Sequence, residues 1–408
     1  MKRRLFLAQA ASGVAALTQT QAQAAVQNQT DAPQPATPAP AEVAPLATTP
    51  PVVMAPRADG ADIVWGVSRH ARGWVEVKQA GEARRFGGSP FGFSSQSEKV
   101  LKVRLEGLPA GARHTYRTVT EAMVDPAARE VSDWREFRTL APVAAETRFL
   151  VWNDTHQNRE TIARLHAASP TGVDFLLWNG DICNDWHREE DIVPTLLHPA
   201  GTDFTAQRPL AFVWGNHDLR GRYGYHLADH VAAPQGRSYF AFRSGPVAVV
   251  CLNTGEDKAD DHPSFKGRVA CEPLRREQAA WLRDHVLKTP ALRDAPYRVL
   301  FCHIPLRWTD ENEAGRTYDS FSRRSRDLWH EAIVAWGAQI IVSGHMHQDA
   351  WIPPAPQFPY AQMVGGGPKP ETATWIEAHA DAARLQLTMR NLTGAVLHQH
   401  EFRPIAAA

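Results

Sequence analysis

The stretch FLVWNDTH, residues 149–156, joins a short apolar run to a carboxylate and an imidazole. The run from Phe149 to Trp152 has the length and composition of a buried strand. Asp154 and His156 follow it almost directly. In extended backbone, side chains two positions apart point the same way. We therefore expect both side chains to reach one point beyond the end of the strand.

The same arrangement recurs along the second half of the chain. Five more apolar runs lie between residues 175 and 342, and helical stretches such as 272–288 and 325–336 alternate with them. This alternation is typical of an α/β layered domain. Only the run 247–252 has no obvious ligand after it. The other runs and their polar blocks are 175–178 with Gly180-Asp181, 210–214 with Gly215-Asn216-His217-Asp218, 299–302 with His303, and 340–342 with Gly344-His345-Met346-His347.

These polar blocks have the chemistry of a metal site. Loops beyond the carboxyl ends of strands can bring side chains to one point, and Gly180, Gly215 and Gly344 permit close backbone approach. Imidazole and carboxylate together suit Zn, Fe or Mn. With His217 set aside, the set exceeds what one tetrahedral metal needs, so we expect two metals that share a carboxylate. The set is Asp154, His156, Asp181, Asn216, His303, His345 and His347.

The order D-x-H, G-D, G-N-H-D, H, G-H-x-H resembles the calcineurin-like metallophosphoesterase superfamily, and it covers roughly half of the chain. The resemblance implies an α/β fold of four layers, a β-sandwich flanked by helices. It also implies a ligand assignment, with Asp181 bridging two metals. One metal would bind Asp154, His156 and His347, and the other would bind Asn216, His303 and His345.

The resemblance reserves His217 for chemistry at the leaving group, as general acid or as stabiliser of the phosphoryl transition state. Asp218 would orient it. Two metals and Asp181 would hold a water whose pKa falls from 15.7 toward about 7, and the resulting hydroxide would attack phosphorus in line. The expected enzyme is a phosphomonoesterase or phosphodiesterase acting on a small-molecule phosphate ester.

A sandwich followed by such a domain resembles the arrangement of purple acid phosphatases. In that family the G-D block continues to a tyrosine that binds ferric iron, but here that position is Asn184. The departure argues against a purple Fe(III) site and leaves the metal open among Fe, Zn and Mn. Other residues near the blocks are candidates for substrate contact or are plain surface and packing residues: Asn158, Asn184, His187, Arg220, Tyr223 and Arg307.

The first part of the chain has a different pattern. Residues 52–142 contain short strand candidates between Gly and Pro turn signals. Leu105 to Pro109, followed by Tyr116, resembles the tyrosine corner of a fibronectin type III-like sandwich. We expect this sandwich to precede the metallophosphoesterase domain at 146–404. The alternative function is a non-catalytic exported binding protein that uses the sandwich and keeps a vestigial metal site, although the complete ligand set argues against it.

Residues 1–24 have the order of an export signal: a basic start, an apolar stretch and a small-residue cleavage site. The pair Arg3-Arg4 resembles a twin-arginine signal, and an ordinary Sec signal is the alternative. Either route predicts a periplasmic or secreted protein. Residues 25–51, rich in Pro and Ala, are expected to form a flexible linker.

Composition limits the partners. Lys plus Arg and Asp plus Glu number 44 each, which argues against a broad basic face for nucleic acid. No segment after the signal is apolar enough to cross a membrane. Four cysteines permit three full pairings, but Cys251 and Cys302 lie in apolar runs and are expected to be buried free thiols. The sequence leaves the oligomeric state open.

Overall fold

The computed structural model describes most of the chain from Ala44 onward. The predicted export signal and residues 25–43 of the predicted linker lie outside the described residues. The described residues are 44–79, 81–89, 91–125, 127–308 and 319–405.

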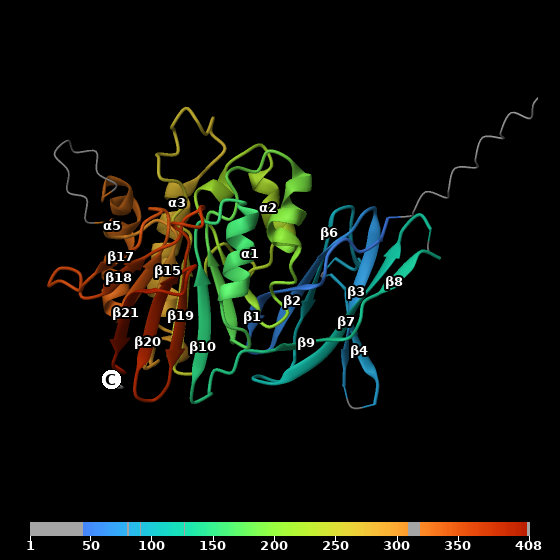
Figure 1. Ribbon diagram of the computed structural model, residues 1–408, viewed down its shortest axis with the longest axis horizontal. Coiled ribbons are helices and arrows are strands. Elements are labelled where there is room, and N and C mark those ends of the chain that lie inside the picture. Colours follow the sequence, from blue (N-terminus) through green and yellow to red (C-terminus); the bar gives the residue numbers. More distant parts are fainter. Residues whose placement is uncertain (1–43, 80, 90, 126, 309–318, 406–408) are drawn as a thin grey trace, which may run out of the picture. The chain divides into compact units, whose positions relative to one another are not determined.

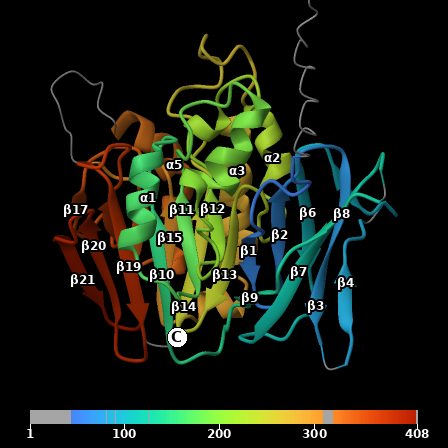
Figure 2. The ribbon, with the colours of Figure 1, turned by 45° about the vertical axis from the view of Figure 1, so that its right-hand side comes forward.

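The largest sheet has nine strands, and Figures 1 and 2 show it running from red C-terminal strands to blue N-terminal strands. Parallel pairing joins its central strands β10 (Thr147–Trp152), β11 (Phe175–Asn179) and β12 (Leu210–Val213). All three are apolar runs named above, and each leads into a polar block. The remaining strands are β21 (Val396–Phe402), β20 (Leu385–Asn391) and β19 (Thr374–Ala380) on one side, and β1 (Val52–Arg57), β2 (Gly60–Gly66) and β6 (Val100–Leu105) on the other.

A second sheet of six strands packs face to face on the first. Alternation along β10 explains the packing, because Phe149 and Val151 enter the core between the two sheets. Leu150 and Trp152 point to the opposite face, which carries the helix α1 (Arg159–Ala168). The second sheet runs in the order β13 (Phe240–Ser244), β14 (Val247–Leu252), β15 (Tyr297–Cys302), β16 (Ile340–Ser343), β18 (Ala361–Val364) and β17 (Ala350–Ile352).

Two helices cover the outer face of the second sheet. They are α3 (Cys271–Trp281) and α5 (Asp319–Trp336), and they correspond to the two helical stretches expected from the sequence. Trp329 and Trp336 of α5 are fully buried in this layer. The order of helix, sheet, sheet and helix confirms the metallophosphoesterase-like α/β fold with several sheets. Shorter helices are α2 (Leu227–His230), α4 (Pro290–Arg293), η1 (Glu189–Asp191), η2 (Val193–Leu197), η3 (Pro199–Gly201), η4 (His217–Leu219), η5 (Gly224–His226) and η6 (Leu282–Val286).

All four cysteines of the chain are buried and free, which confirms the expectation for Cys251 and Cys302. Within the part of the chain that the structure describes, no helix combines the length and apolarity that a membrane crossing requires.

The N-terminal strands form a sandwich that shares a sheet with the catalytic half. β1 pairs in parallel with β12 through Met54 and Leu210, so β1, β2 and β6 extend the nine-stranded sheet. Trp65 is fully buried between the sandwich layers and donates a hydrogen bond to Thr120 Oγ1 at 2.9 Å. The second layer consists of β4 (Ala83–Phe86), β3 (Ala71–Lys78), β7 (Arg113–Ala122) and β8 (Arg129–Val131), with β5 (Ser95–Ser97) and β9 (Arg135–Arg138) paired to β3 and β7.

The fibronectin type III-like description of this sandwich stays a prediction. Tyr116 is buried against Phe137, with ring centroids 5.5 Å apart. Among the described residues, however, its hydroxyl has no hydrogen bond of the kind that defines a tyrosine corner. The shared sheet also means that the boundary expected near residue 142 does not separate two independent sheets.

The end of the predicted linker is part of the fold. Leu46 is only 1% exposed and belongs to the sandwich core. The backbone N–H groups of Leu46 and Ala47 donate to the carboxylate of Glu130, and Thr48 N–H donates to Gly66 O at 2.9 Å. The linker prediction is therefore wrong for residues 44–51, because composition alone did not reveal these contacts.

We predict that Leu46→Ala lowers the free energy of unfolding by about 2–5 kcal/mol, because it removes a buried side chain from the sandwich core. Urea unfolding measures this change. Val143→Ala is the control, since Val143 is 98% exposed and should change stability by less than about 0.5 kcal/mol. Equal stability of the two variants would mean that residues 44–51 form a linker, as the sequence predicted.

Candidate metal centre

The structure brings six of the seven predicted ligands into two groups of potential ligand atoms. Asp154, His156 and His347 form one group, in which the atoms lie within 4.8 Å of one another. Asp181, His303 and His345 form the other. A third group, His156, Asp181 and His217, overlaps both of these and includes the residue that the resemblance reserves for chemistry. The first group has the residues of one metal set that the resemblance implies, and the second joins His303 and His345 of the other set to Asp181, which also lies 3.5 Å from His156.

In the first group two imidazoles face one point. The Nε2 atoms of His156 and His347 are 3.0 Å apart, and His347 Nε2 is 3.6 Å from Asp154 Oδ1. His156 Nδ1 lies 2.9 Å from Asn184 Oδ1. A proton on Nδ1 would satisfy this amide oxygen and leave the Nε2 lone pair for a cation. Asn184 occupies the position at which purple acid phosphatases have a tyrosine ligand, and here its side chain orients His156.

In the second group Asp181 and His303 are buried and His345 is half-buried. His303 Nδ1 donates to the Asn179 carbonyl at 2.9 Å, which directs Nε2 to within 3.1 Å of Asp181 Oδ2. Asn216, the seventh predicted ligand, is 1% exposed, and its Oδ1 has no hydrogen-bond donor in the described part of the chain. A buried amide oxygen without a donor is costly unless something else satisfies it. A metal ion fits this donor set.

The charges in the site also suit cations. Burial lowers the pKa of His156 to about 4 and that of His345 to about 3, so both imidazoles are neutral. Burial raises the pKa of Asp154 to about 8. Burial would also raise the pKa of Asp181, but the positive charge of His303 outweighs it and holds that pKa below its ordinary value. The two carboxylates in turn outweigh burial at His303 and raise its pKa to about 10. Asp181 is thus held as a carboxylate beside a positively charged His303.

The ligand loops are not extended, contrary to the expectation that adjacent ligands share a face of extended backbone. The left-handed region of φ is costly for residues other than glycine and is often found at functional sites. Hydrogen bonds between loops hold this backbone, such as His156 N–H to Asp181 O at 3.0 Å and Gly344 N–H to His303 O at 2.9 Å. The ligands with positive φ are Asp154 (51°), His156 (44°), Asp181 (49°), His345 (71°) and His347 (53°).

Three glycines make room for the carboxylates and imidazoles, as the sequence predicted. A Cβ on Gly344 would lie 2.2 Å from Asp154 Oδ2, and one on Gly215 would lie 2.2 Å from Asp181 Oδ1. Gly180 has a φ of +82°, and a Cβ there would meet His303 Nδ1 at 2.6 Å. The carboxylates can approach their positions only because these side chains are missing.

His217 lies beside the ligands, and its partners differ from the expectation. Its Nδ1 contacts the Asn184 carbonyl and lies 3.1 Å from Asp185 Oδ1. Arg220 Nη1 lies 3.1 Å from its Nε2. Because arginine can only donate, Nε2 accepts this bond and the ring proton is on Nδ1. Asp185 therefore orients His217, in place of Asp218.

The carboxylate of Asp218 binds backbone instead. It accepts N–H groups of Asp181 and Gly215 at 2.9 Å each and of Ile182 at 3.2 Å. Asp218 is fully buried. The prediction that Asp218 orients His217 is wrong for this reason: its oxygens are directed at the loops after β11 and β12. Its role is to position the backbone that carries Asp181 and Asn216.

The fourth apolar run contributes to the site through carboxylates that the sequence analysis did not single out. Glu256, fully buried in the loop after β14, accepts from Arg220 Nε and Nη2 at 2.9 and 2.8 Å. Asp257 accepts from Arg220 Nη2 at 3.0 Å. No spacing motif marks these residues. Both hold Arg220, which itself contacts His217, and Asp257 also acts electrostatically on His345.

Other residues near the blocks have various roles. Asn158 accepts Thr161 N–H and begins α1, and Arg307 donates to two backbone carbonyls. Tyr223 packs against the core on the outer face of the nine-stranded sheet. His187 and Arg220 line a cavity of about 350 Å³ beside His217.

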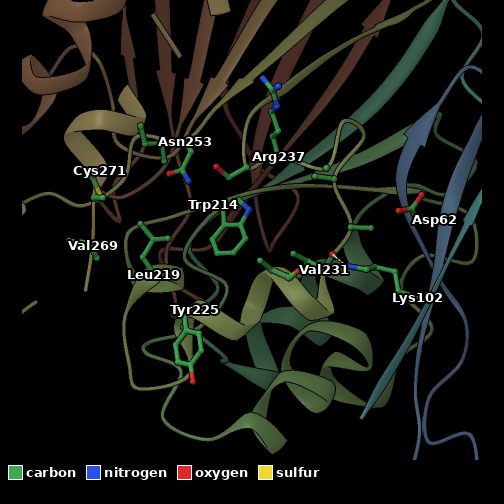
Figure 3. Close-up of a pocket in the computed structure, with 18 of the residues that line it drawn as sticks. Asp62, Lys102, Trp214, Leu219, Tyr225, Val231, Arg237, Asn253, Val269 and Cys271 are labelled. Atoms are coloured by element: carbon green, nitrogen blue, oxygen red, sulfur yellow. Dashed lines mark hydrogen bonds between the residues drawn. The ribbon is translucent and has the colours of Figure 1, made fainter. Parts of the chain in front are cut away.

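A larger cavity, of about 860 Å³, lies to one side of the ligands. None of the seven predicted metal ligands lines it. Figure 3 shows Trp214 and Leu219 among its walls, with Lys102 and Asp62 from the sandwich at one end. The two cavities share Gly221, Arg222 and Arg268. The larger cavity thus adjoins the smaller one.

We predict that Gly344→Ala reduces metal content and destabilises the protein by about 1–3 kcal/mol, because the new methyl group overlaps the Asp154 carboxylate. Metal analysis and thermal unfolding measure the two effects. Gly88→Ala is the matched control, because no atom lies within 4 Å of a Cβ built there. If both variants kept wild-type metal content, the glycine would not be required by the ligand geometry.

Comparison with known proteins agrees with this site. A family model described as calcineurin-like phosphoesterase matches residues 147–349. Serine/threonine-protein phosphatase CPPED1 is similar, with 29% identity for the Pongo abelii protein and 28% for the human protein, each over 142 residues, 35% of this chain and 42% of the relative. The matched region therefore spans less than half the length of these curated relatives.

Two solved structures show the same fold at low identity. Purple acid phosphatase PPD1 from yellow lupin has a TM-score of 0.61 and 13% identity, covering 86% of this chain and 74% of that chain. PhoD has a TM-score of 0.62 and 12% identity, covering 91% and 94%. The matched family model covers all five ligand blocks, and the structural neighbours share the layers that carry them. Residues 147–349 of the chain form a calcineurin-like phosphoesterase domain.

Proposed function

We propose that this protein is a metal-dependent phosphoesterase that hydrolyses a small phosphate ester at a dinuclear centre. The proposal includes two metal ions of the Fe, Zn or Mn type. It also includes export to the periplasm or cell exterior, for which residues 1–24 are the support. The phosphoesterase domain and the phosphatase relatives support the reaction class.

One observation carries the proposal: the ligand atoms converge in two groups linked by one carboxylate. Asp181 lies 3.1 Å from His303 Nε2 and 3.5 Å from His156 Nε2, so it faces both groups. Asn216 offers a buried oxygen with no donor among the described residues. A purely structural polar cluster would satisfy such atoms internally.

When bound, the metal ions would supply an activated water and neutralise charge on the phosphoryl oxygens. The chain's residues would do the remaining work. His217 would face the leaving oxygen, while Asp185 fixes its tautomer and Arg220 occupies its Nε2 until substrate arrives. Asp218 would keep the Asp181 and Gly215 backbone in place during the reaction.

We predict that chelation abolishes hydrolysis of 4-nitrophenyl phosphate and that the reconstituted protein contains two metals per chain. Asp181→Asn should lose both metal and turnover, because it removes the carboxylate that faces both groups. Full activity in a metal-stripped sample would refute the proposal. Metal content well below one per chain after reconstitution would favour the non-catalytic binding protein.

We predict that His217→Ala lowers kcat by about 10²–10⁴-fold while it leaves metal content unchanged, because the imidazole assists the leaving group and binds no metal. Steady-state kinetics and metal analysis separate these effects. His70→Ala, at an exposed position in the sandwich, is the control and should behave as wild type. Loss of metal in His217→Ala would make this residue a ligand instead.

A further inference from the structure

The smaller cavity beside His217 has an excess of cationic side chains. It has a volume of about 350 Å³, the size of a site for a small organic molecule and not for a polymer. The chain as a whole has no net charge, so this excess is local. The cationic residues of its lining are Arg220, Arg222, Lys258 and Arg268, and the lining contains one carboxylate, Asp185.

Two of these cations are already neutralised. Arg220 is bound by Glu256 and Asp257 at 2.8 and 3.0 Å. Lys258 Nζ lies 2.7 Å from the same Asp257 carboxylate. Their positive charge is therefore balanced within the protein, and Arg220 serves chiefly to connect the loop after β14 with His217.

Arg222 and Arg268 are different, because within the described ranges no carboxylate lies at ion-pair distance from either guanidinium. Arg268 donates from Nε to Phe265 O at 3.1 Å and from Nη1 to Gly221 O at 3.0 Å. These carbonyls hold the guanidinium without neutralising it and leave further N–H donors. Arg222 lies over the Tyr223 ring, 5.0 Å from its centroid. An arginine held in this way is suited to bind a carboxylate or phosphate.

The position of the cavity relates these arginines to the leaving group. Asp185 and Arg220 line the cavity, and both also contact the His217 imidazole. The cavity therefore begins where His217 would face the leaving oxygen. Arg222 and Arg268 line the same cavity as Asp185 and Arg220, so a group bound to the two arginines would share this cavity with the leaving group.

We propose that the substrate's leaving group carries a second anionic group, a phosphate or carboxylate, which Arg222 and Arg268 bind. The inference rests on the proposed function and narrows its substrate class to phosphate esters with two separated anionic groups. A neutral or apolar leaving group would leave the two guanidinium charges unmatched.

Bisphosphates of linear alkanediols of increasing length, compared with the matching alkanol monophosphates, test this inference on the metal-loaded protein. The best bisphosphate should have a kcat/KM about tenfold above its monophosphate, well above the statistical factor of two from its identical ends. Calorimetric binding of the same compounds to the metal-loaded protein measures recognition independently of turnover. Equal binding and equal kcat/KM for both series would overturn the inference.

Substitutions test whether Arg222 and Arg268 are the residues that bind the second anionic group. Arg222→Gln and Arg268→Gln should each reduce the preference for the bisphosphate several-fold and leave hydrolysis of the monophosphate unchanged. Arg113→Gln is the control, because its side chain is 80% exposed on β7 and its loss should preserve the preference. An unchanged preference in both test variants would also overturn the inference. If no ester is hydrolysed, the proposed function fails, and binding of the bisphosphate by wild type but not by the arginine variants would still support the anion site.

Discussion

The geometry of the site depends on one buried carboxylate that touches no metal position. Asp218 accepts N–H groups from Asp181, Ile182 and Gly215, and so ties the loop after β11 to the loop after β12. Burial raises its pKa to about 7, and repulsion by Asp181 adds to this effect, while the backbone N–H donors oppose it. The converging N–H donors offset the cost of desolvating this buried charge. Asp181 and Asn216 are placed through this contact.

Crowding at the strand ends explains both the left-handed backbone of the predicted ligands and the presence of glycines beside them. The carboxyl ends of β10, β11 and β16 lie close together, and each chain must turn sharply while its side chain points inward. Positive φ at Asp154 and Asp181 achieves the turn. The missing Cβ at Gly344 and Gly215 then gives the carboxylate oxygens their space. Each of these strained aspartates therefore lies against a glycine, Asp154 against Gly344 and Asp181 against Gly215. A substitution at the glycine would displace the aspartate.

The strands and the polar residues that converge beyond their ends could be predicted from the sequence because both have local signals. An apolar run of the length of β11 or β15 can be recognised on its own, and an aspartate or histidine directly after it is equally visible. The junction between the sandwich and the nine-stranded sheet has no such signal, since it rests on the pairing of Met54 with Leu210, which are far apart in the sequence. The partner of His217 was missed because family resemblance suggested its chain neighbour, whereas Asp185 reaches it from another loop.

The contact between Arg220 and His217 bears on whether the imidazole acts as a general acid or as a stabiliser of the phosphoryl transition state. A general acid must carry a proton on the atom that faces the leaving oxygen, yet here Nε2 accepts an N–H of Arg220 and is unprotonated. Protonation of Nε2 would place two donors against each other, unless Arg220 moved toward Glu256 and Asp257, which already hold it. An arriving phosphoryl or leaving oxygen offers the alternative, because it can accept from Arg220 and from a protonated Nε2 together. On this argument an arriving ester would convert His217 from acceptor to donor, and the acid role proposed above would become available only with the ester bound.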